Sequence, residues 1–225
     1  MKFVGLMLSA LCLFLSCSTL PKVHPVDGPS AADLHRKCRL PFPVGKWQFL
    51  HTIRATVPGG GKALMLGVTI ISSREETARC VIMTIEGLVV FDALYDQHIV
   101  INRGIHPFDS KDFAEGLMRD IRLIFFRPEG PLTESGIRED GLSTCRYQGP
   151  EGRTVDIITH SDNSWEIGQY DRHSNLTRRV RAFFGRDGGE PDPPGIPGRL
   201  ELSAHGVPGY ALELDLVEAV VLPRE

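Results

Sequence analysis

The chain has 225 residues, of which 42% are apolar and 24% are charged, enough for one domain with a sizeable core. The formal net charge of −3 gives no reason to expect a nucleic acid or an anionic membrane surface as a partner.

The N-terminus has the features of an export signal. Lys2 supplies a positive charge, and residues 3–15 form an apolar segment of 13 residues. A helix needs roughly 20 such residues to span a bilayer. No later run is long and apolar enough, so the remainder is predicted to be soluble, with any membrane attachment at the N-terminus.

Cys17 ends this segment. Ser16 is small enough for ordinary signal cleavage, but Phe14 is too large for the position that it would occupy. The four residues that end at Cys17 (Phe-Leu-Ser-Cys) resemble a bacterial lipobox, with Phe in place of the usual Leu. We therefore expect a lipoprotein signal peptide over 1–16 and acyl chains such as palmitate on Cys17, which would anchor the protein stably. The alternative is a cysteine that happens to end a conventional signal. Ser18, where Asp would favour the inner membrane, favours the outer membrane of a Gram-negative bacterium, facing the periplasm.

Three cysteines remain after the signal and the anchor. An odd number in an oxidising compartment allows at most one intramolecular bridge. Cys38 and Cys145 lie in polar surroundings and could pair, although the sequence leaves this open. Cys80 lies in an apolar stretch and is expected to be a buried small hydrophobe.

Residues 17–30 contain the lipidated cysteine and a proline-rich tether. A short helix is predicted to follow from Ser30, as N-cap, to Cys38, with Pro41 ending it. The folded domain is expected over 31–225.

Five strands with short connections are predicted next. Apolar and polar residues alternate in the first two, which is the period of a half-buried strand. Short connections favour antiparallel neighbours. The expected strands are 47–57, 64–70, 80–85, 88–91 and 98–101.

The period then changes to that of a helix over residues 109–126, with Asp109 or Ser110 as the cap. A wide apolar stripe needs a surface to cover. The stripe consists of Phe113, Leu117, Ile121 and Phe125.

Six more strands are predicted after a Pro/Gly-rich loop at 128–136. One of them carries Arg178, Arg179 and Arg181, which indicate a solvated face or an anion site. The expected strands are 142–148, 153–160, 164–171, 175–184, 199–203 and 210–222. The fold class is thus mainly β (α+β): a curved antiparallel sheet of about eleven strands, a half-barrel with one amphipathic helix as a lid and a short N-terminal helix.

A large antiparallel sheet curls, and a single helix covers it incompletely. We therefore expect an apolar cavity between sheet and helix, suited to an elongated hydrophobe. The alternative is a core that side chains fill. The predicted cavity residues are Phe49, Ile53, Leu66, Val68, Ile82, Phe91, Phe113, Leu117 and Ile121.

The order of lipoprotein signal, short helix, five strands, helix and six strands resembles the LolA/LolB family of lipoprotein carriers and receptors, over about residues 30–222. The stretch Pro-Pro-Gly-Ile-Pro-Gly-Arg-Leu-Glu-Leu (193–202), followed by the two-sided strand 210–222, resembles the C-terminal pair of that family. The resemblance implies non-covalent binding of lipid or acylated protein in the concave cavity.

The membrane-anchored receptor of that family inserts a protruding leucine, which lies between its third and fourth strands. The matching turn here is 85–88, which makes Leu88 the candidate for membrane insertion. The turn is short, however, and this favours an ordinary strand residue.

Catalysis is not expected. His51 lies on the apolar side of a strand, where a structural role is favoured, and residues 160–162 (His-Ser-Asp) resemble a turn more than a catalytic triad. No metal-ligand spacing is present, and no cofactor is expected.

The sequence thus predicts a monomeric, membrane-anchored envelope lipoprotein that binds lipid or lipidated protein, without nucleic acid as a partner. A structural or assembly lipoprotein without a small ligand is the alternative, and a lipid-acting hydrolase is a third.

Overall fold

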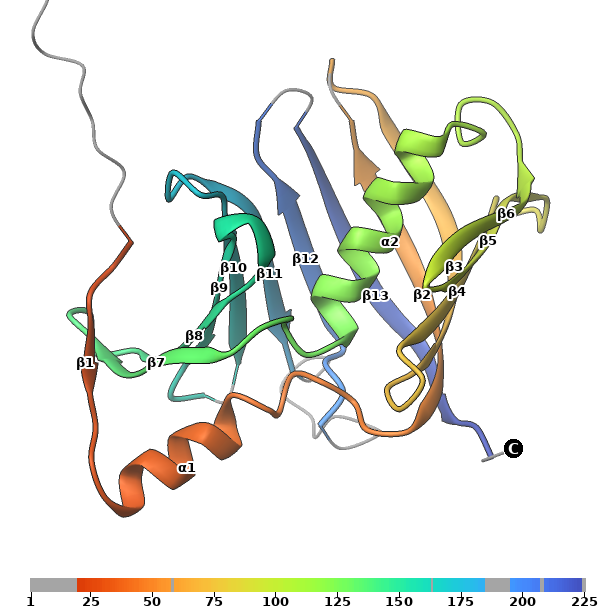
Figure 1. The fold of residues 1–225 in the computed structure, drawn as a ribbon. Coiled ribbons are helices and arrows are strands. Elements are labelled where there is room, and N and C mark those ends of the chain that lie inside the picture. Colours follow the sequence, from red (N-terminus) through yellow and green to blue (C-terminus); the bar gives the residue numbers. More distant parts are fainter. Residues whose placement is uncertain (1–19, 58, 163, 185–194, 207–208, 224–225) are drawn as a thin grey trace, which may run out of the picture.

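The computed structural model describes residues 20–57, 59–162, 164–184, 195–206 and 209–223. They form one 13-stranded antiparallel sheet that curves around helix α2 (Figure 1). The strand order is β1-β7-β8-β9-β10-β11-β12-β13-β2-β3-β4-β5-β6, and the sheet is open because β1 and β6 are its two edges. The expected signal peptide, the lipidation site Cys17 and the first residues of the tether lie outside the described residues.

One limb of the half-barrel contains the five consecutive strands that the sequence predicts as antiparallel neighbours, and this order is confirmed. Their bounds are β2 Lys46–Thr56, β3 Lys62–Ser72, β4 Thr77–Met83, β5 Val89–Asp96 and β6 His98–Gly104.

The other limb runs from the edge to the middle of the sheet, and its last strand, β13, pairs with β2 to join the limbs. The bounds are β7 Leu132–Arg138, β8 Ser143–Gln148, β9 Thr154–Thr159, β10 Trp165–Tyr170, β11 Leu176–Phe183, β12 Arg199–Ala204 and β13 Tyr210–Val221.

The sheet has two strands more than the predicted eleven. Strand β1 (Val23–Pro25) lies in the expected tether, and β7 occupies much of the expected loop at 128–136. Residues Leu132–Glu134 of β7 are exposed, so no apolar alternation marks this strand in the sequence. A proline is tolerated in β1 because β1 is an edge strand.

Helix α1 (Pro29–Lys37) begins one residue before Ser30, with Gly28 at the N-cap position, so the predicted serine cap is wrong. A proline at the first helical position is pre-organised for this start. Helix α2 (Lys111–Phe125) is capped as predicted, because the Ser110 hydroxyl accepts a hydrogen bond from the Phe113 amide at 3.2 Å. A single-turn 3₁₀ helix, η1 (Pro150–Gly152), connects β8 and β9.

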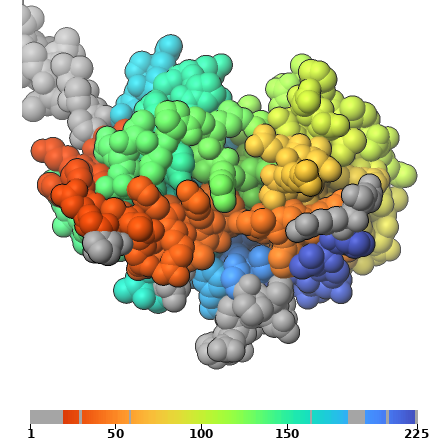
Figure 2. All heavy atoms as spheres, turned by 60° about the horizontal axis from the view of Figure 1, so that its bottom comes forward, coloured from red at the N-terminus to blue at the C-terminus, as the bar shows by residue number. Residues whose placement is uncertain are grey.

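The disulfide that the sequence left open is formed between Cys38 and Cys145, across 107 residues of chain. It ties the end of α1 to β8, and α1 packs beside β7 and β8. Figure 2 shows the N-terminal segment, in orange, crossing one end of the half-barrel. Cys80 is free and buried, as expected, and burial raises the pKa of its thiol to about 12.

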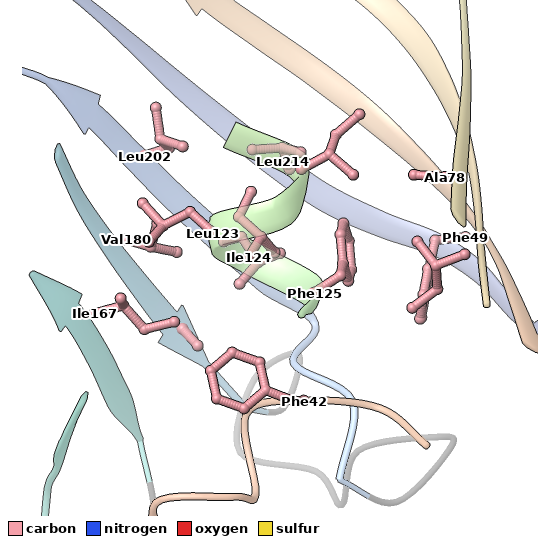
Figure 3. Close-up of a cluster of buried hydrophobic side chains, with 14 of the residues drawn as sticks. Phe42, Phe49, Ala78, Leu123, Ile124, Phe125, Ile167, Val180, Leu202 and Leu214 are labelled. Carbon is pink, nitrogen blue, oxygen red and sulfur yellow. The ribbon is translucent and has the colours of Figure 1, made fainter. Parts of the chain in front are cut away.

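The core lies between the concave face of the sheet and α2. Figure 3 shows Ile124 and Phe125 of α2 among side chains from both limbs, with Phe42 of the N-terminal segment closing one end. The rings of Phe49 and Phe125 stack with their centroids 4.9 Å apart. The end of the helix is therefore packed tightly into the sheet.

Candidate functional site

A groove of about 520 Å³ runs along the outer side of α2. This volume falls in the range of roughly 300–1,000 Å³ that is usual for ligand sites. The groove is lined by Glu76, Tyr95, Ile99, Glu115, Met118, Arg119, Arg122, Leu123, Phe126, Arg127, Pro128, Glu129, Gly130, Gly149, Pro150, Arg153, Val155 and Gln169.

Helix α2 presents two different faces because its apolar residues recur at helical spacing. One face buries Ala114, Ile121 and Ile124 against the sheet. The other face presents Glu115, Arg119 and Arg122 to the groove, and the buried side chains of Met118 and Leu123 lie at the two borders of this face. The same helix thus builds the core and the wall of the groove.

The floor of the groove is apolar and its rim is charged. Arg122 forms an ion pair with Glu129, and its guanidinium carbon lies 4.9 Å from the centroid of the Tyr95 ring. At the other end of this helix face, Glu115 pairs with Lys111 at 3.2 Å. Such a surface accommodates a ligand with an apolar body and a polar end.

A buried polar cluster fixes α2 on the sheet. Asp120 accepts hydrogen bonds from Arg178 of β11, at 2.5 Å, and from the Tyr210 hydroxyl of β13. Burial raises the pKa of the Asp120 carboxyl, against the opposing effects of Arg178 and Tyr210, and burial together with Asp120 raises the pKa of Tyr210. These contacts set the position of the helix, and hence the width of the groove.

The three arginines of β11 therefore divide between the two faces of the sheet. Arg178 faces inward to Asp120, whereas Arg179 and Arg181 each lie 3.1 Å from Glu166 on the other face. The expected solvated face consequently includes only two of them.

A second hollow, of about 10 Å³, lies beside His51, Phe125 and Trp165. It is large enough for one water molecule at most. His51 is 3% exposed, and burial lowers its pKa to about 4, against the opposing effect of Asp215. This histidine is structural, as the sequence indicated.

The nine predicted cavity residues are placed differently from the groove, since none of them lines it. Phe49, Ile82, Phe91 and Ile121 are buried in the core. Ile53, Phe113 and Leu117 are partly buried against it. These seven side chains fill the space where the cavity was expected.

Leu66 and Val68 lie on the opposite face of the sheet, so their assignment to the concave side is wrong by one residue. In the β2–β3 register, the inward residue His51 lies opposite Gly67, which leaves Leu66 and Val68 pointing outward. A Cβ atom at Gly67 would lie 2.5 Å from Cδ1 of Ile53, so a larger side chain there would disturb the packing of Ile53.

The turn between β4 and β5 exposes two large apolar side chains, Ile85 at 59% and Leu88 at 53%. Leu88 precedes β5, so the expectation of an ordinary strand residue is wrong. Gly87, with a φ of +88°, allows the tight reversal, and its amide donates to the Thr84 carbonyl.

The His-Ser-Asp stretch forms a turn, because the Asp162 carboxylate accepts hydrogen bonds from the amide and hydroxyl of Ser164. Within the described ranges, no group of three or more His, Cys, Asp or Glu residues is arranged to hold a metal ion. No described helix has the length and apolar character needed to cross a membrane.

The groove residues were missed because the sequence draws attention to the apolar stripe of α2 and not to its second face. Two Pro/Gly-containing loops, 128–130 and 149–152, bring Arg127 and Arg153 to the groove. The proline and glycine content of these two loops was the available signal, since loops on a rigid scaffold often carry binding residues.

The fold is similar to that of a LolA superfamily protein from Nitrosomonas europaea, with a TM-score of 0.53 and 13% sequence identity over 87% of this chain and 94% of that chain. An outer membrane lipoprotein-sorting protein domain from Vibrio parahaemolyticus aligns with a TM-score of 0.43 and 10% identity, over 85% of this chain and 92% of that chain. A DUF1329 family protein from Desulfovibrio piger aligns with a TM-score of 0.41 and 13% identity, over the same shares.

No protein-family model matches the sequence, and none of the curated proteins compared with it matches significantly. The match to the Nitrosomonas europaea structure shows that the chain has a LolA-like half-barrel fold, which the order of its predicted elements indicated.

Proposed function

We propose that the protein is an envelope lipoprotein, anchored through acyl chains on Cys17, that non-covalently binds an acyl chain, a lipid or a lipidated protein. The groove of about 520 Å³ along α2 carries the proposal, because the apolar side chains of Phe126, Tyr95 and Ile99 line it and are each partly exposed. The LolA-like fold supports it. The role requires no covalent chemistry, and we place the protein on the periplasmic side of the outer membrane.

The ligand site in this proposal is the groove on the outer side of α2, not the space beneath the helix. Phe126, Tyr95 and Ile99 line this groove, are each partly exposed and provide apolar surface for a hydrocarbon chain, whereas Met118, which is 1% exposed, belongs to the core. The space beneath the helix is occupied by side chains such as Phe49 and Phe91, which are 1% and 0% exposed.

Native mass spectrometry of residues 18–225, incubated with an envelope lipid extract and then repurified, tests lipid binding. We expect a co-purifying lipid that Phe126→Asp abolishes, because a carboxylate in the apolar floor would have to be desolvated by the ligand. Phe183→Asp is the matched control, since Phe183 is exposed and lies outside the groove. Recovery of no lipid from the wild type would contradict lipid binding.

A structural or assembly lipoprotein without a small ligand remains the second candidate, and the filled core is the observation that favours it. In that case the wild type and Phe126→Asp would both be free of lipid, and both would retain the envelope function.

The anchor is tested by labelling with radioactive palmitate in cells. The wild type should incorporate label and Cys17→Ala should not, because the thiol is the attachment point. Equal labelling of the two would contradict the anchor.

We also propose that the turn with Ile85 and Leu88 touches the membrane when cargo is transferred. Two exposed apolar side chains on a tight turn can enter the interface of a bilayer. Leu88→Glu in residues 18–225 should reduce co-sedimentation with lipid vesicles, whereas Val44→Glu, at an exposed valine outside this turn, should leave it unchanged. Equal losses in both variants would contradict a specific role of the turn.

A further inference from the structure

The arginines of the groove differ in how they are neutralised. Arg122 is paired with Glu129. Arg119, Arg127 and Arg153 form no ion pair with any carboxylate in the part of the chain that the structure describes; Arg153 donates only a long bond of 3.4 Å to the Pro150 carbonyl. Three guanidinium groups on the rim are therefore available to a ligand.

The acidic residues of the groove do not compensate for them. Glu115 is engaged by Lys111 and Glu129 by Arg122, which leaves Glu76, an exposed residue at the β3–β4 turn. The uncompensated charge of the rim is thus positive, although the net charge of the whole chain is −3.

Two of these arginines are brought to the same end of the groove by loops that are fixed to each other. The Gln148 amide donates to the Pro131 carbonyl at 3.0 Å. At Gly130 the loops are so close that a Cβ atom would lie 2.0 Å from the Gln148 carbonyl oxygen. Arg127 and Arg153 extend from these two loops, so the backbone from which each side chain starts is held in place relative to the other.

The apolar floor begins beside this end. Phe126, the residue before Arg127, is partly exposed there, and Leu123 and Val155 lie behind it with 8% and 7% of their surface exposed. A guanidinium pair next to an apolar floor matches a molecule with a negatively charged oxygen group at one end and a hydrocarbon chain behind it.

We propose that the groove is selective for a single-chain amphiphile with an anionic headgroup, a phosphate or a carboxylate, held by Arg127 and Arg153 with its chain on the apolar floor. This inference rests on the proposed lipid binding and specifies the class of lipid. Arg119 lies within α2, six residues before Phe125, the last residue of the helix, or about 9 Å along the helix axis, and so contributes further along the groove.

Titration calorimetry with two matched lipids tests the proposal. Lysophosphatidic acid and monoacylglycerol of the same chain length, both below the concentration at which they form micelles, differ only in the phosphate. We expect the wild type to bind lysophosphatidic acid on the order of tenfold more tightly, because charge-assisted hydrogen bonds replace the hydration of the phosphate.

In Arg127→Gln/Arg153→Gln the two lipids should bind about equally, and monoacylglycerol should bind as it does to the wild type. The control is the double variant Arg179→Gln/Arg181→Gln, which loses the same charge. Both of these arginines lie outside the groove, on the opposite face of the sheet beside Glu166. This control should retain the preference.

The outcomes separate this inference from the function on which it rests. Equal binding of both lipids by the wild type, or an unchanged preference in the Arg127/Arg153 variant, would overturn the anionic selectivity and leave lipid binding intact. Binding of neither lipid would overturn the proposed function and this inference with it. Displacement of lysophosphatidic acid by an equal concentration of inorganic phosphate would show that the site binds free anions. It would overturn the proposal that the ligand is an amphiphile.

Discussion

At the scale of single residues, one buried ion pair positions helix α2 on the sheet. Asp120 and Arg178 have side chains that are 4% and 13% exposed, and they join α2 to β11. Because the pair is buried, removal of one partner leaves the other charge without compensation. The position of the groove wall thus depends on one ion pair.

Asp120→Ala is therefore expected to lower the free energy of unfolding by about 3–5 kcal/mol. Denaturant-induced unfolding measures this. Glu115→Gln, on the exposed side of the same helix, should change stability by less than about 1 kcal/mol, since its pair with Lys111 is solvated. A loss in Asp120→Ala no larger than that in Glu115→Gln would contradict the role of the cluster.

His51 predicts a dependence of stability on pH. Its pKa is lowered to about 4 in the folded protein by burial, against about 6.5 in the unfolded chain. The unfolded state therefore binds more protons between these values, and stability is complete above pH 6.5 and lost as the pH falls toward 4. The full loss is about 3 kcal/mol.

The measurement compares unfolding free energies of the wild type and His51→Leu from pH 7 to pH 4. The difference between the unfolding free energies of the two proteins should change by about 3 kcal/mol over this range. This change with pH is independent of any constant effect that the substitution has on stability. A difference that does not vary with pH would contradict a neutral buried histidine.

At the scale of secondary-structure elements, β1 depends on a close approach to β7. A Cβ atom at Gly136 would lie 1.9 Å from the His24 carbonyl oxygen, which the backbone cannot accommodate. We expect Gly136→Ala to detach β1 and to make the amides of Val23 and His24 exchange rapidly with solvent.

Hydrogen–deuterium exchange tests this, and Gly116→Ala is the matched control. Nothing lies within 4 Å of a Cβ atom at Gly116, and alanine favours the helix interior, so this variant should be as stable as the wild type or more so. Unchanged protection of β1 in Gly136→Ala would contradict the steric argument.

Elements with strong periodicity could be predicted from the sequence, and elements held by their neighbours could not. The alternation of apolar and polar residues predicts strand β2, and the apolar stripe predicts helix α2. Ser110 marks the start of the helix. Strand β7 is largely polar and exposed in its first half, so only its pairing with β1 and β8 identifies it.

The site was harder to predict than the fold. A strand pattern does not specify which alternate residues face inward when apolar side chains occupy both faces, as Leu66 and Ile53 illustrate. Nor does a helical stripe indicate how completely its side chains fill the sheet. The groove depends on both, and also on two loops whose contact follows from tertiary packing.

At the scale of the whole molecule, the Cys38–Cys145 disulfide connects the N-terminal segment to the far limb of the sheet. A bridge that closes a loop of 107 residues restricts the unfolded chain strongly. Cys38→Ser/Cys145→Ser should lower the free energy of unfolding by about 2–5 kcal/mol.

Unfolding with and without a thiol reductant provides the check. The reductant should destabilise the wild type and leave the double serine variant unaffected, because Cys80 is not part of a bridge. An equal effect of the reductant on both proteins would contradict a stabilising disulfide.

The pairing of β13 with β2 has a consequence for biogenesis. Among the strands that the structure describes, β13 is the last in the sequence, yet it occupies the middle of the sheet. Its residues Ala211 to Val221 pair with Thr56 to Trp47 of β2. Until β13 is in place, the two limbs therefore have no strand between them, and β12 and β2 each have an unprotected hydrogen-bonding edge. The sheet can close only through contacts between residues far apart in the sequence, which makes its completion slow compared with that of either limb.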